Sequence, residues 1–312
     1  MNRFVLRVAA PAALAALLTT GCLGCSQQPT TAAPSVSSTP NPTSAAQADF
    51  DATISALEVS YDARVGVSLL DTSDDSVLDH RAGERFGFAS SVKALIAAAM
   101  LNTLTEGERE QRVTWSQADL DRAGYTPVTS VHVNEGMTYD ALAEAAVRTS
   151  DNAATNLVLA RLGGPEAVTA AFRAFGDSTT VLAREEPRLN EWEVGSTANT
   201  STPRAMTEAL RSVLVGDALS PKSRATLLGW MSDNPTGDAL IRAGAPAGWS
   251  VADKSGGAGG MRNDIAIVTP PGGAPIILSV LTQRNDPDAK WDDELVAKAA
   301  QAALSAVSST RG

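Results

Sequence analysis

Strand-like segments lie at both ends of this 312-residue chain, and the stretch between them has a helical pattern. Apolar, β-branched segments occur at residues 65–70 and 76–80, and again at residues 250–254, 264–269 and 275–281. Residues 90–219 instead repeat apolar side chains mostly at helical spacing. The simplest arrangement pairs the strands of the two ends in one antiparallel sheet.

We therefore expect an α+β fold with an antiparallel sheet built from N- and C-terminal strands and flanked by helices. The catalytic domain would span residues 48–312. Its α/β lobe would comprise residues 48–83 and 220–312, and an all-helical lobe, residues 84–219, would be inserted between them. A functional site is expected in the cleft between the lobes.

The first 47 residues have the pattern of an export segment. Arg3 and Arg7 precede an Ala/Leu-rich run that is too short to span a membrane and that ends near Cys22. Residues 1–22 resemble a bacterial lipoprotein signal in which Cys22 is lipidated; the alternatives are lipidation of Cys25 or a plain secretory signal. Residues 23–47 are rich in Ser, Thr, Pro and Ala, which predicts a disordered tether.

These features predict an exported monomer that touches the membrane only through its N-terminal lipid anchor. It would lie on the outer face of the cytoplasmic membrane or be released to the periplasm or extracellular space. The net charge of −10 argues against a nucleic-acid partner. Both cysteines lie in the export segment, so the mature domain lacks a disulfide. The two histidines lack metal spacing, so we expect no metal and no other cofactor.

The segment Ser90-Ser91-Val92-Lys93 places a serine and a lysine three residues apart at the start of an apolar helix. On a helix these positions share one face, so the amine can reach the hydroxyl. Lys93 is the only lysine before Lys222, and a buried lysine can lose its proton and act as a base, whereas arginine cannot. Alternatively, Ser90 caps the helix and Lys93 extends into solvent.

Ser150-Asp151-Asn152 precedes another helical segment. The alternative to a catalytic role for this triplet is a helix cap. The same triplet recurs at residues 232–234, where a following Pro-Thr-Gly indicates a turn. Lys254-Ser255-Gly256 ends a late strand and precedes more glycines. Such a strand can pair with a substrate amide, while Lys254 and Ser255 hold a carboxylate. A glycine hairpin with a surface lysine is the alternative.

These three elements, in this order, are the signature of the serine penicillin-recognising enzymes. From about residue 50 to residue 306 the chain resembles a class A β-lactamase. Arg184-Glu185-Glu186-Pro187-Arg188-Leu189-Asn190 fits the family's R-x-E-P-x-L-N loop, which penicillin-binding transpeptidases lack. The alternative for this segment is an exposed acidic loop.

The resemblance implies a serine β-lactamase that hydrolyses the β-lactam amide through an acyl-serine and gives resistance to β-lactam antibiotics. Its implied catalytic residues are Ser90, Lys93, Ser150, Glu186 and Lys254. Its implied substrate-binding residues are Asn152, Asn190, Ser255, Gly257, Tyr125 and Arg262. The rival functions are a D,D-peptidase or transpeptidase acting on cell-wall peptides, which has no use for Glu186, and a non-catalytic β-lactam-sensing lipoprotein.

Four positions depart from the family pattern. Asn199 stands where an aspartate usually pairs with the loop arginine, here Arg184, so the loop is expected to be looser. The hairpin after Lys254 is one residue shorter than the family's hairpin. The assignment of family roles to Gly257 and Arg262 therefore depends on how the two hairpins are aligned. Leu240 stands where some relatives carry a carboxylate-binding arginine. Thr149 replaces a larger residue before Ser150.

Overall fold

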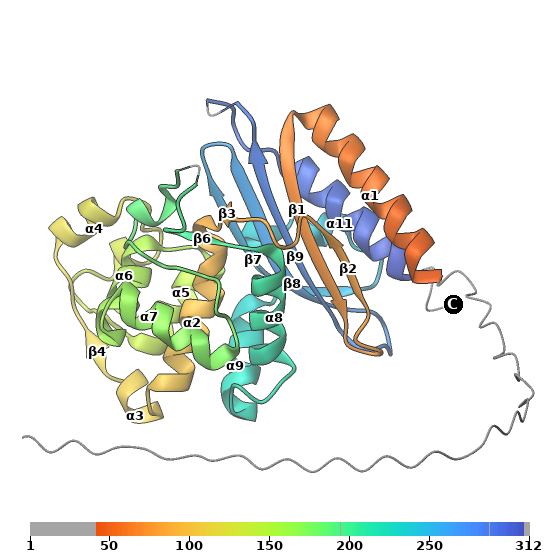
Figure 1. Cartoon of the computed structure of the whole chain (residues 1–312). Coiled ribbons are helices and arrows are strands. Elements are labelled where there is room, and N and C mark those ends of the chain that lie inside the picture. Colours follow the sequence, from red (N-terminus) through yellow and green to blue (C-terminus); the bar gives the residue numbers. More distant parts are fainter. Residues whose placement is uncertain (1–41, 194, 287, 309–312) are drawn as a thin grey trace, which may run out of the picture. The chain divides into compact units, whose positions relative to one another are not determined.

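The computed structural model describes residues 42–193, 195–286 and 288–308, all of which belong to one compact unit of the chain. Its centre is a five-stranded antiparallel sheet with the strand order β2-β1-β9-β8-β7. Two strands come from the N-terminal end and three from the C-terminal end, as expected from the sequence (Figure 1). The α+β fold class is therefore confirmed.

The strands of the main sheet are β1 (Ala63–Asp71), β2 (Val77–His80), β7 (Ser250–Ala258), β8 (Met261–Thr269) and β9 (Ile276–Arg284). Short strand pairs form outside it: β3 (Phe86–Gly87) with β6 (Thr200–Ser201), and β4 (Arg112–Val113) with β5 (Met137–Thr138). The α-helices are α1 (Pro42–Tyr61), α2 (Lys93–Thr103), α3 (Glu106–Arg109), α4 (Gln117–Ala123), α5 (Tyr139–Arg148), α6 (Asn152–Leu162), α7 (Pro165–Phe172), α8 (Pro203–Leu214), α9 (Pro221–Met231), α10 (Ile241–Gly244) and α11 (Asp293–Ser308). The 3₁₀ helices are η1 (Ala89–Val92), η2 (Thr129–Val131), η3 (Arg173–Phe175), η4 (Arg188–Asn190) and η5 (Pro235–Gly237).

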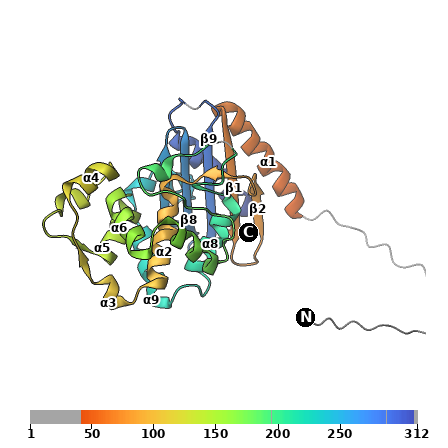
Figure 2. The ribbon, with the colours of Figure 1, turned by 60° about the vertical axis from the view of Figure 1, so that its left-hand side comes forward.

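Two apolar cores lie on the two faces of the sheet. On one face, α1 and α11 pack against the strands and against each other, and they bury side chains such as Phe50, Ile54 and Leu304. On the other face, α8 covers β1 and β9, and most of the other helices form the lobe seen beyond it in Figures 1 and 2, whereas α10 packs against α11. The sheet therefore contributes apolar side chains to both cores, which explains why its strands are apolar almost throughout.

Helix α2 runs through the middle of the helical lobe and packs against α5, α6, α7 and α9. Every residue from Lys93 to Leu101 is buried. A helix surrounded by other helices has no polar face, and its alanines allow close packing, so the apolar run in the sequence has a direct explanation. The first residue of this buried helix is the lysine singled out above.

The structure corrects several expected boundaries. Helix α1 begins at Pro42, so the last residues of the predicted tether 23–47 are helical; residues 1–41, including Cys22, lie outside the described part. Strand β7 continues through the glycines to Ala258, where the sequence predicted that the strand ends near Lys254. Paired glycines can extend a strand when the backbone ladder is satisfied, and here β8 supplies that ladder. None of the described helices is long and apolar enough to cross a membrane.

Candidate active site

Ser90 and Lys93 lie at the junction of η1 and α2. Ser90 caps neither helix, because the N-cap residues of η1 and α2 are Phe88 and Val92, and neither helix has a side-chain cap hydrogen bond. The Lys93 side chain has no exposed surface. The alternative of a helix cap beside a solvated lysine is therefore wrong, and the lysine is held inside the protein with its amine close to polar partners.

The Lys93 amine makes contacts that join three segments of the chain. It donates to the Ser150 backbone carbonyl at 2.9 Å, to Ser150 Oγ at 3.3 Å and to Asn152 Oδ1 at 2.7 Å. It also lies 2.8 Å from Glu186 Oε1. Burial lowers the pKa of Lys93, while the charge of Glu186 acts in the opposite direction and limits the fall.

Glu186 is held by amide side chains on two sides of its loop. Asn156 on α6 pairs with the Glu186 backbone, donating to its carbonyl at 2.9 Å and accepting from its N–H at 2.8 Å. Asn190 Nδ2 donates to Glu186 Oε2 at 2.7 Å. The Glu186 side chain is fully buried, whereas Glu185 is exposed, so the two glutamates are not interchangeable surface charges.

Ser90 and Lys93 meet at the same carboxylate oxygen. Ser90 Oγ lies 3.5 Å from Glu186 Oε1, the atom that also contacts the Lys93 amine. The described contacts of Lys93 do not include Ser90. The Lys93 amine and the Ser90 hydroxyl, which were expected to meet directly, are linked in this structure through Glu186. The serine, the lysine and the glutamate nonetheless converge on one point.

Asp151 is a structural residue that the sequence indicated only as a helix cap. It does cap α6, accepting from the Ala154 N–H at 2.9 Å. It also accepts from the backbone N–H groups of Val128 and Thr129 and from the Thr129 hydroxyl. The segment that carries Tyr125 is thereby fixed beside Ser150, which has a positive φ of 60°.

Strand β7 forms the opposite wall of the site. A Cβ atom on Gly256 would lie 2.9 Å from the Ser90 nitrogen and 2.6 Å from the Ser91 nitrogen, so only glycine lets the strand approach η1 this closely. Gly257 follows next along the strand. The close approach, which the sequence did not identify, brings the strand backbone alongside the serine.

Lys254 lies behind this wall with no exposed surface, and its amine donates to the Ser255 carbonyl at 2.7 Å. Burial and the charge of Lys93 lower the pKa of Lys254 to about 7. Two buried carboxyls lie near it, and burial raises the pKa of Asp253 to about 6 and that of Asp264 well above its usual range. Asp253 is paired with Arg242 at 2.6 Å.

A cleft of about 570 Å³ opens between β7 and the helical lobe. Eight of the predicted residues line it: Ser90, Tyr125, Ser150, Asn152, Asn190, Ser255, Gly257 and Arg262. Lys93, Glu186 and Lys254 are buried just beneath it. The sequence did not assign six further lining residues to the cleft, which lie in η5, on loops or at a helix start: Pro235, Thr236, Asp238, Ala239, Trp291 and Asp293.

Arg262 is positioned by two of these unpredicted residues. Its Nε lies 2.5 Å from the Asp293 carboxylate, and its guanidinium lies 5.5 Å from the centre of the Trp291 ring. Gly257 pairs with Arg262 across the hairpin, so the shortened turn still brings both to the cleft. Leu240 is fully buried in the core between the sheet and α11 and does not line the cleft.

Asn199 replaces the missing ion pair with four hydrogen bonds. Its Oδ1 accepts from the N–H groups of Ala183 and Arg184, at 3.0 and 3.2 Å. Its Nδ2 donates to the carbonyls of Arg188 and Glu191, at 3.2 and 3.1 Å. Arg184 pairs instead with Glu191 at 2.8 Å. The amide therefore ties the two limbs of the loop together, which a carboxylate could not do because it lacks donors.

A buried lysine beside a serine, a carboxylate aimed at both, and a strand that can bind an amide define an active-site-serine acyl-transfer enzyme. Among the described residues no cluster could hold a metal ion.

The comparisons agree with this class. A profile of the β-lactamase enzyme family matches residues 49–307. A β-lactamase of Bacillus licheniformis is 46% identical over 252 residues, which cover 80% of this chain and 81% of the relative. The β-lactamase ROB-1 of Haemophilus influenzae is 42% identical over 286 residues, covering 91% and 93%. A class A β-lactamase crystal structure from Clostridium kluyveri superposes with a TM-score of 0.81 at 40% identity, covering 84% and 99%. The chain belongs to the β-lactamase enzyme family, and within it to class A.

Proposed function

We propose that the protein hydrolyses the amide bond of β-lactam antibiotics through an acyl-serine and thereby gives resistance to them. The convergence of Ser90, Lys93 and the buried Glu186 carries this proposal. The names and structures of the relatives support it along nearly the whole described chain.

In the acylation step, Ser90 Oγ attacks the lactam carbonyl carbon and its proton passes to Glu186, through a water molecule, or to Lys93. The 3.5 Å distance to Glu186 Oε1 supports the glutamate, and the lowered pKa of Lys93 keeps the lysine available as a base. The backbone N–H groups of Ser90 and Gly257 would bind the developing oxyanion. Ser150, in contact with the Lys93 amine, would deliver a proton to the departing ring nitrogen.

In the deacylation step, a water molecule attacks the acyl-serine and Glu186 takes its proton. Asn190 is suited to orient that water, because its Nδ2 is bonded to Glu186 while its buried Oδ1 has no protein partner among the described residues. A buried acceptor without a partner favours a hydrogen-bond donor at that point. Water supplies such a donor, and the Asn190 amide would hold it beside the base.

Substrate binding uses the remaining lining residues. Lys254, Ser255 and Arg262 would hold the substrate carboxylate, and Asn152 the side-chain amide. Tyr125, whose side chain is largely exposed at the cleft, would form a wall.

Steady-state hydrolysis of a chromogenic cephalosporin by the purified protein tests the proposal. We expect multiple turnovers by the wild type and none by Ser90→Ala, because the nucleophile is lost. A single turnover by the wild type, followed by a long-lived adduct, would instead identify a penicillin-binding peptidase. No reaction at all would identify a non-catalytic receptor.

We also propose that residues 1–22 are a lipoprotein signal and that Cys22 anchors the exported monomer to the outer face of the cytoplasmic membrane. The arginines, apolar run and cysteine of the sequence support this. Labelled palmitate should be incorporated by the wild type and by Cys25→Ser, and lost in Cys22→Ser. Loss in Cys25→Ser alone would assign the anchor to the second cysteine, and no label in any form would favour a plain secretory signal.

A further inference from the structure

Trp291 leaves a large apolar surface open inside the catalytic cleft. The chain has five tryptophans, all within the part that the structure describes, and Trp291 alone among them is exposed. It lies in the loop that precedes α11, lines the cleft and is 46% exposed. Because an indole ring gains much from burial, an open one on a concave surface favours a ligand that covers it.

The ring is held beside the groups assigned to the reaction. A Cβ atom on Gly257 would lie 3.5 Å from Trp291 Cε3, so the ring packs on the backbone of β7. The Arg262 guanidinium lies 5.5 Å from the centre of the ring, and its Nε is fixed by the Asp293 carboxylate. Trp291 is therefore positioned next to the arginine that would hold the substrate carboxylate.

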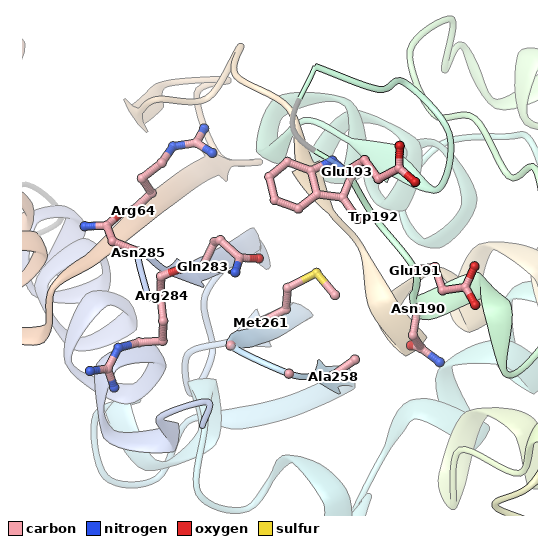
Figure 3. Close-up of a pocket in the computed structure, with 12 residues that line it drawn as sticks. Arg64, Asn190, Glu191, Trp192, Glu193, Ala258, Met261, Gln283, Arg284 and Asn285 are labelled. Carbon is pink, nitrogen blue, oxygen red and sulfur yellow. Dashed lines mark hydrogen bonds between the residues drawn. The ribbon is translucent and has the colours of Figure 1, made fainter. Parts of the chain in front are cut away.

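This part of the cleft differs from the pocket beyond the β7–β8 hairpin. That pocket, of about 580 Å³, contains the side chains of Trp192, Met261 and Gln283 (Figure 3). Its lining residues and those of the cleft have only Asn190 in common. Trp291 would therefore contact a different part of a bound substrate from the groups drawn in Figure 3.

The cleft wall also carries negative charge. Asp238 and Asp293 line it, with side chains that are 67% and 40% exposed. Asp293 is paired with Arg262. Asp238 lies 3.1 Å from Arg242, but Arg242 lies closer, at 2.6 Å, to the buried Asp253. One guanidinium thus serves two carboxylates, which leaves Asp238 only partly compensated and favours a cation in the cleft.

The chemistry of cephalosporins places one substituent in this region. The ring carbon that bears the carboxylate is bonded directly to the carbon that bears the second ring substituent. With the carboxylate held by Lys254, Ser255 and Arg262, that substituent starts beside the guanidinium and faces the neighbouring indole. A cation over the face of an indole ring is attracted by the ring quadrupole, and an aromatic cation adds stacking.

We propose that Trp291 is a specificity-determining residue whose ring stacks on an aromatic cation carried next to the substrate carboxylate, while Asp238 attracts its positive charge. The inference rests on the proposed function and extends it to a preferred substrate class, cephalosporins with a pyridinium-type substituent at this position. Penicillins carry only methyl groups on the corresponding carbon and would gain little from Trp291.

The test compares two cephalosporins with the same acylamino side chain, one with a pyridiniummethyl group beside the carboxylate and one with a methyl group there. The measured quantity is the ratio of their kcat/KM values for the full protein, divided by the wild-type ratio, which removes the difference in chemical reactivity. Trp291→Leu should lower the ratio by about two- to fivefold. Trp291→Phe, which keeps a ring, should restore most of it.

Asp238→Asn tests the charge separately. It should lower the ratio by about twofold at low ionic strength and have no effect in 1 M salt, where screening acts within about 3 Å. Matched controls are Asp217→Asn, at an exposed position, and Trp249→Leu, both outside the cleft. Both should keep the wild-type ratio.

Equal losses for both cephalosporins in Trp291→Leu would show that the ring only positions Arg262, and an unchanged ratio would show that it touches no substituent. Either result overturns the inference while wild-type hydrolysis upholds the proposed function. An unchanged ratio in Asp238→Asn at low salt would overturn the role of that carboxylate. Failure of the wild type to hydrolyse either cephalosporin would overturn both the inference and the proposed function.

Discussion

At the residue scale, the site depends on burying charged groups together. Lys93, Glu186 and Lys254 have almost no exposed surface, so each charge depends on its neighbours rather than on water. Removing one partner leaves the other charge buried and alone, which is costly. The protonation of these groups is therefore part of the chemistry, and it should be visible in the dependence of activity on pH.

Lys254 provides the clearest pH prediction. Its pKa of about 7 means that the free enzyme carries the cation below pH 7 and loses it as the pH rises. For a carboxylate-bearing substrate, kcat/KM should therefore fall by up to about tenfold per pH unit above 7, with KM rising and kcat nearly constant. Steady-state kinetics from pH 6 to 9 measure this. Lys254→Arg, which stays charged, should flatten the alkaline limb. An unchanged limb in that variant would assign the titration to another group.

How far single residues could be predicted depended on whether their role is local. Lys93 could be identified because a lone lysine starts an apolar helix three residues after a serine, a relation contained in four consecutive residues. Thr236, Trp291 and Asp293 could not, because they reach the cleft only through the folding of distant loops. Gly256 could be predicted in part. Its place in the motif was evident from the sequence, but its close approach to η1 depends on the tertiary structure.

At the element scale, the loop that carries Glu186 was expected to be looser because Asn199 cannot form the family's ion pair, yet the Asn199 amide holds it with four hydrogen bonds. The R-x-E-P-x-L-N pattern predicted this loop, but it could not predict the hydrogen bonds of Asn199, since their partners depend on how the loop folds back. Similar limits affected the strand and helix ends. Glycines after Lys254 resemble a turn yet extend β7, and polar residues before Phe50 resemble a tether yet form the first turns of α1.

Asn199→Asp tests the role of that amide. The carboxylate would lose both donor bonds and would face the carbonyls of Arg188 and Glu191. We expect a loss of unfolding free energy of about 1–3 kcal/mol, together with slower deacylation because Glu186 is less well held. Thermal unfolding and single-turnover kinetics measure the two effects. Asn102→Asp, at an exposed position on α2, should change neither. An equally stable Asn199→Asp protein would mean that Arg184 can turn to pair with the new carboxylate.

At the scale of the whole molecule, the two ends of the described chain close one of the two cores. Helix α1 packs against α11 and β1, so the N-terminal helix stabilises the same sheet that carries Lys254 and Gly257 on β7. The placement of strands at both ends of the sequence, with helices between them, predicted this arrangement, because one sheet built from both ends is the simplest way to pair the strands.

Ile54→Ala tests this closure. Ile54 on α1 has no exposed surface, and its truncation should lower the unfolding free energy by about 2–5 kcal/mol. Val59 on the same helix is 84% exposed, so Val59→Ala should change stability by less than about 0.5 kcal/mol. Urea unfolding of both variants measures the contrast. Similar values for the two would mean that α1 contributes little to the core.

The central claim is that the Glu186 carboxylate releases the acyl group from Ser90. The most direct measurement is rapid mixing of Glu186→Ala with a chromogenic cephalosporin, followed by intact-protein mass spectrometry. We expect product equivalent to about one turnover per enzyme, then no steady rate, with an acyl adduct that maps to Ser90, because loss of the base slows breakdown of the adduct more than its formation. Steady turnover equal to that of the wild type, with no adduct, would contradict the account.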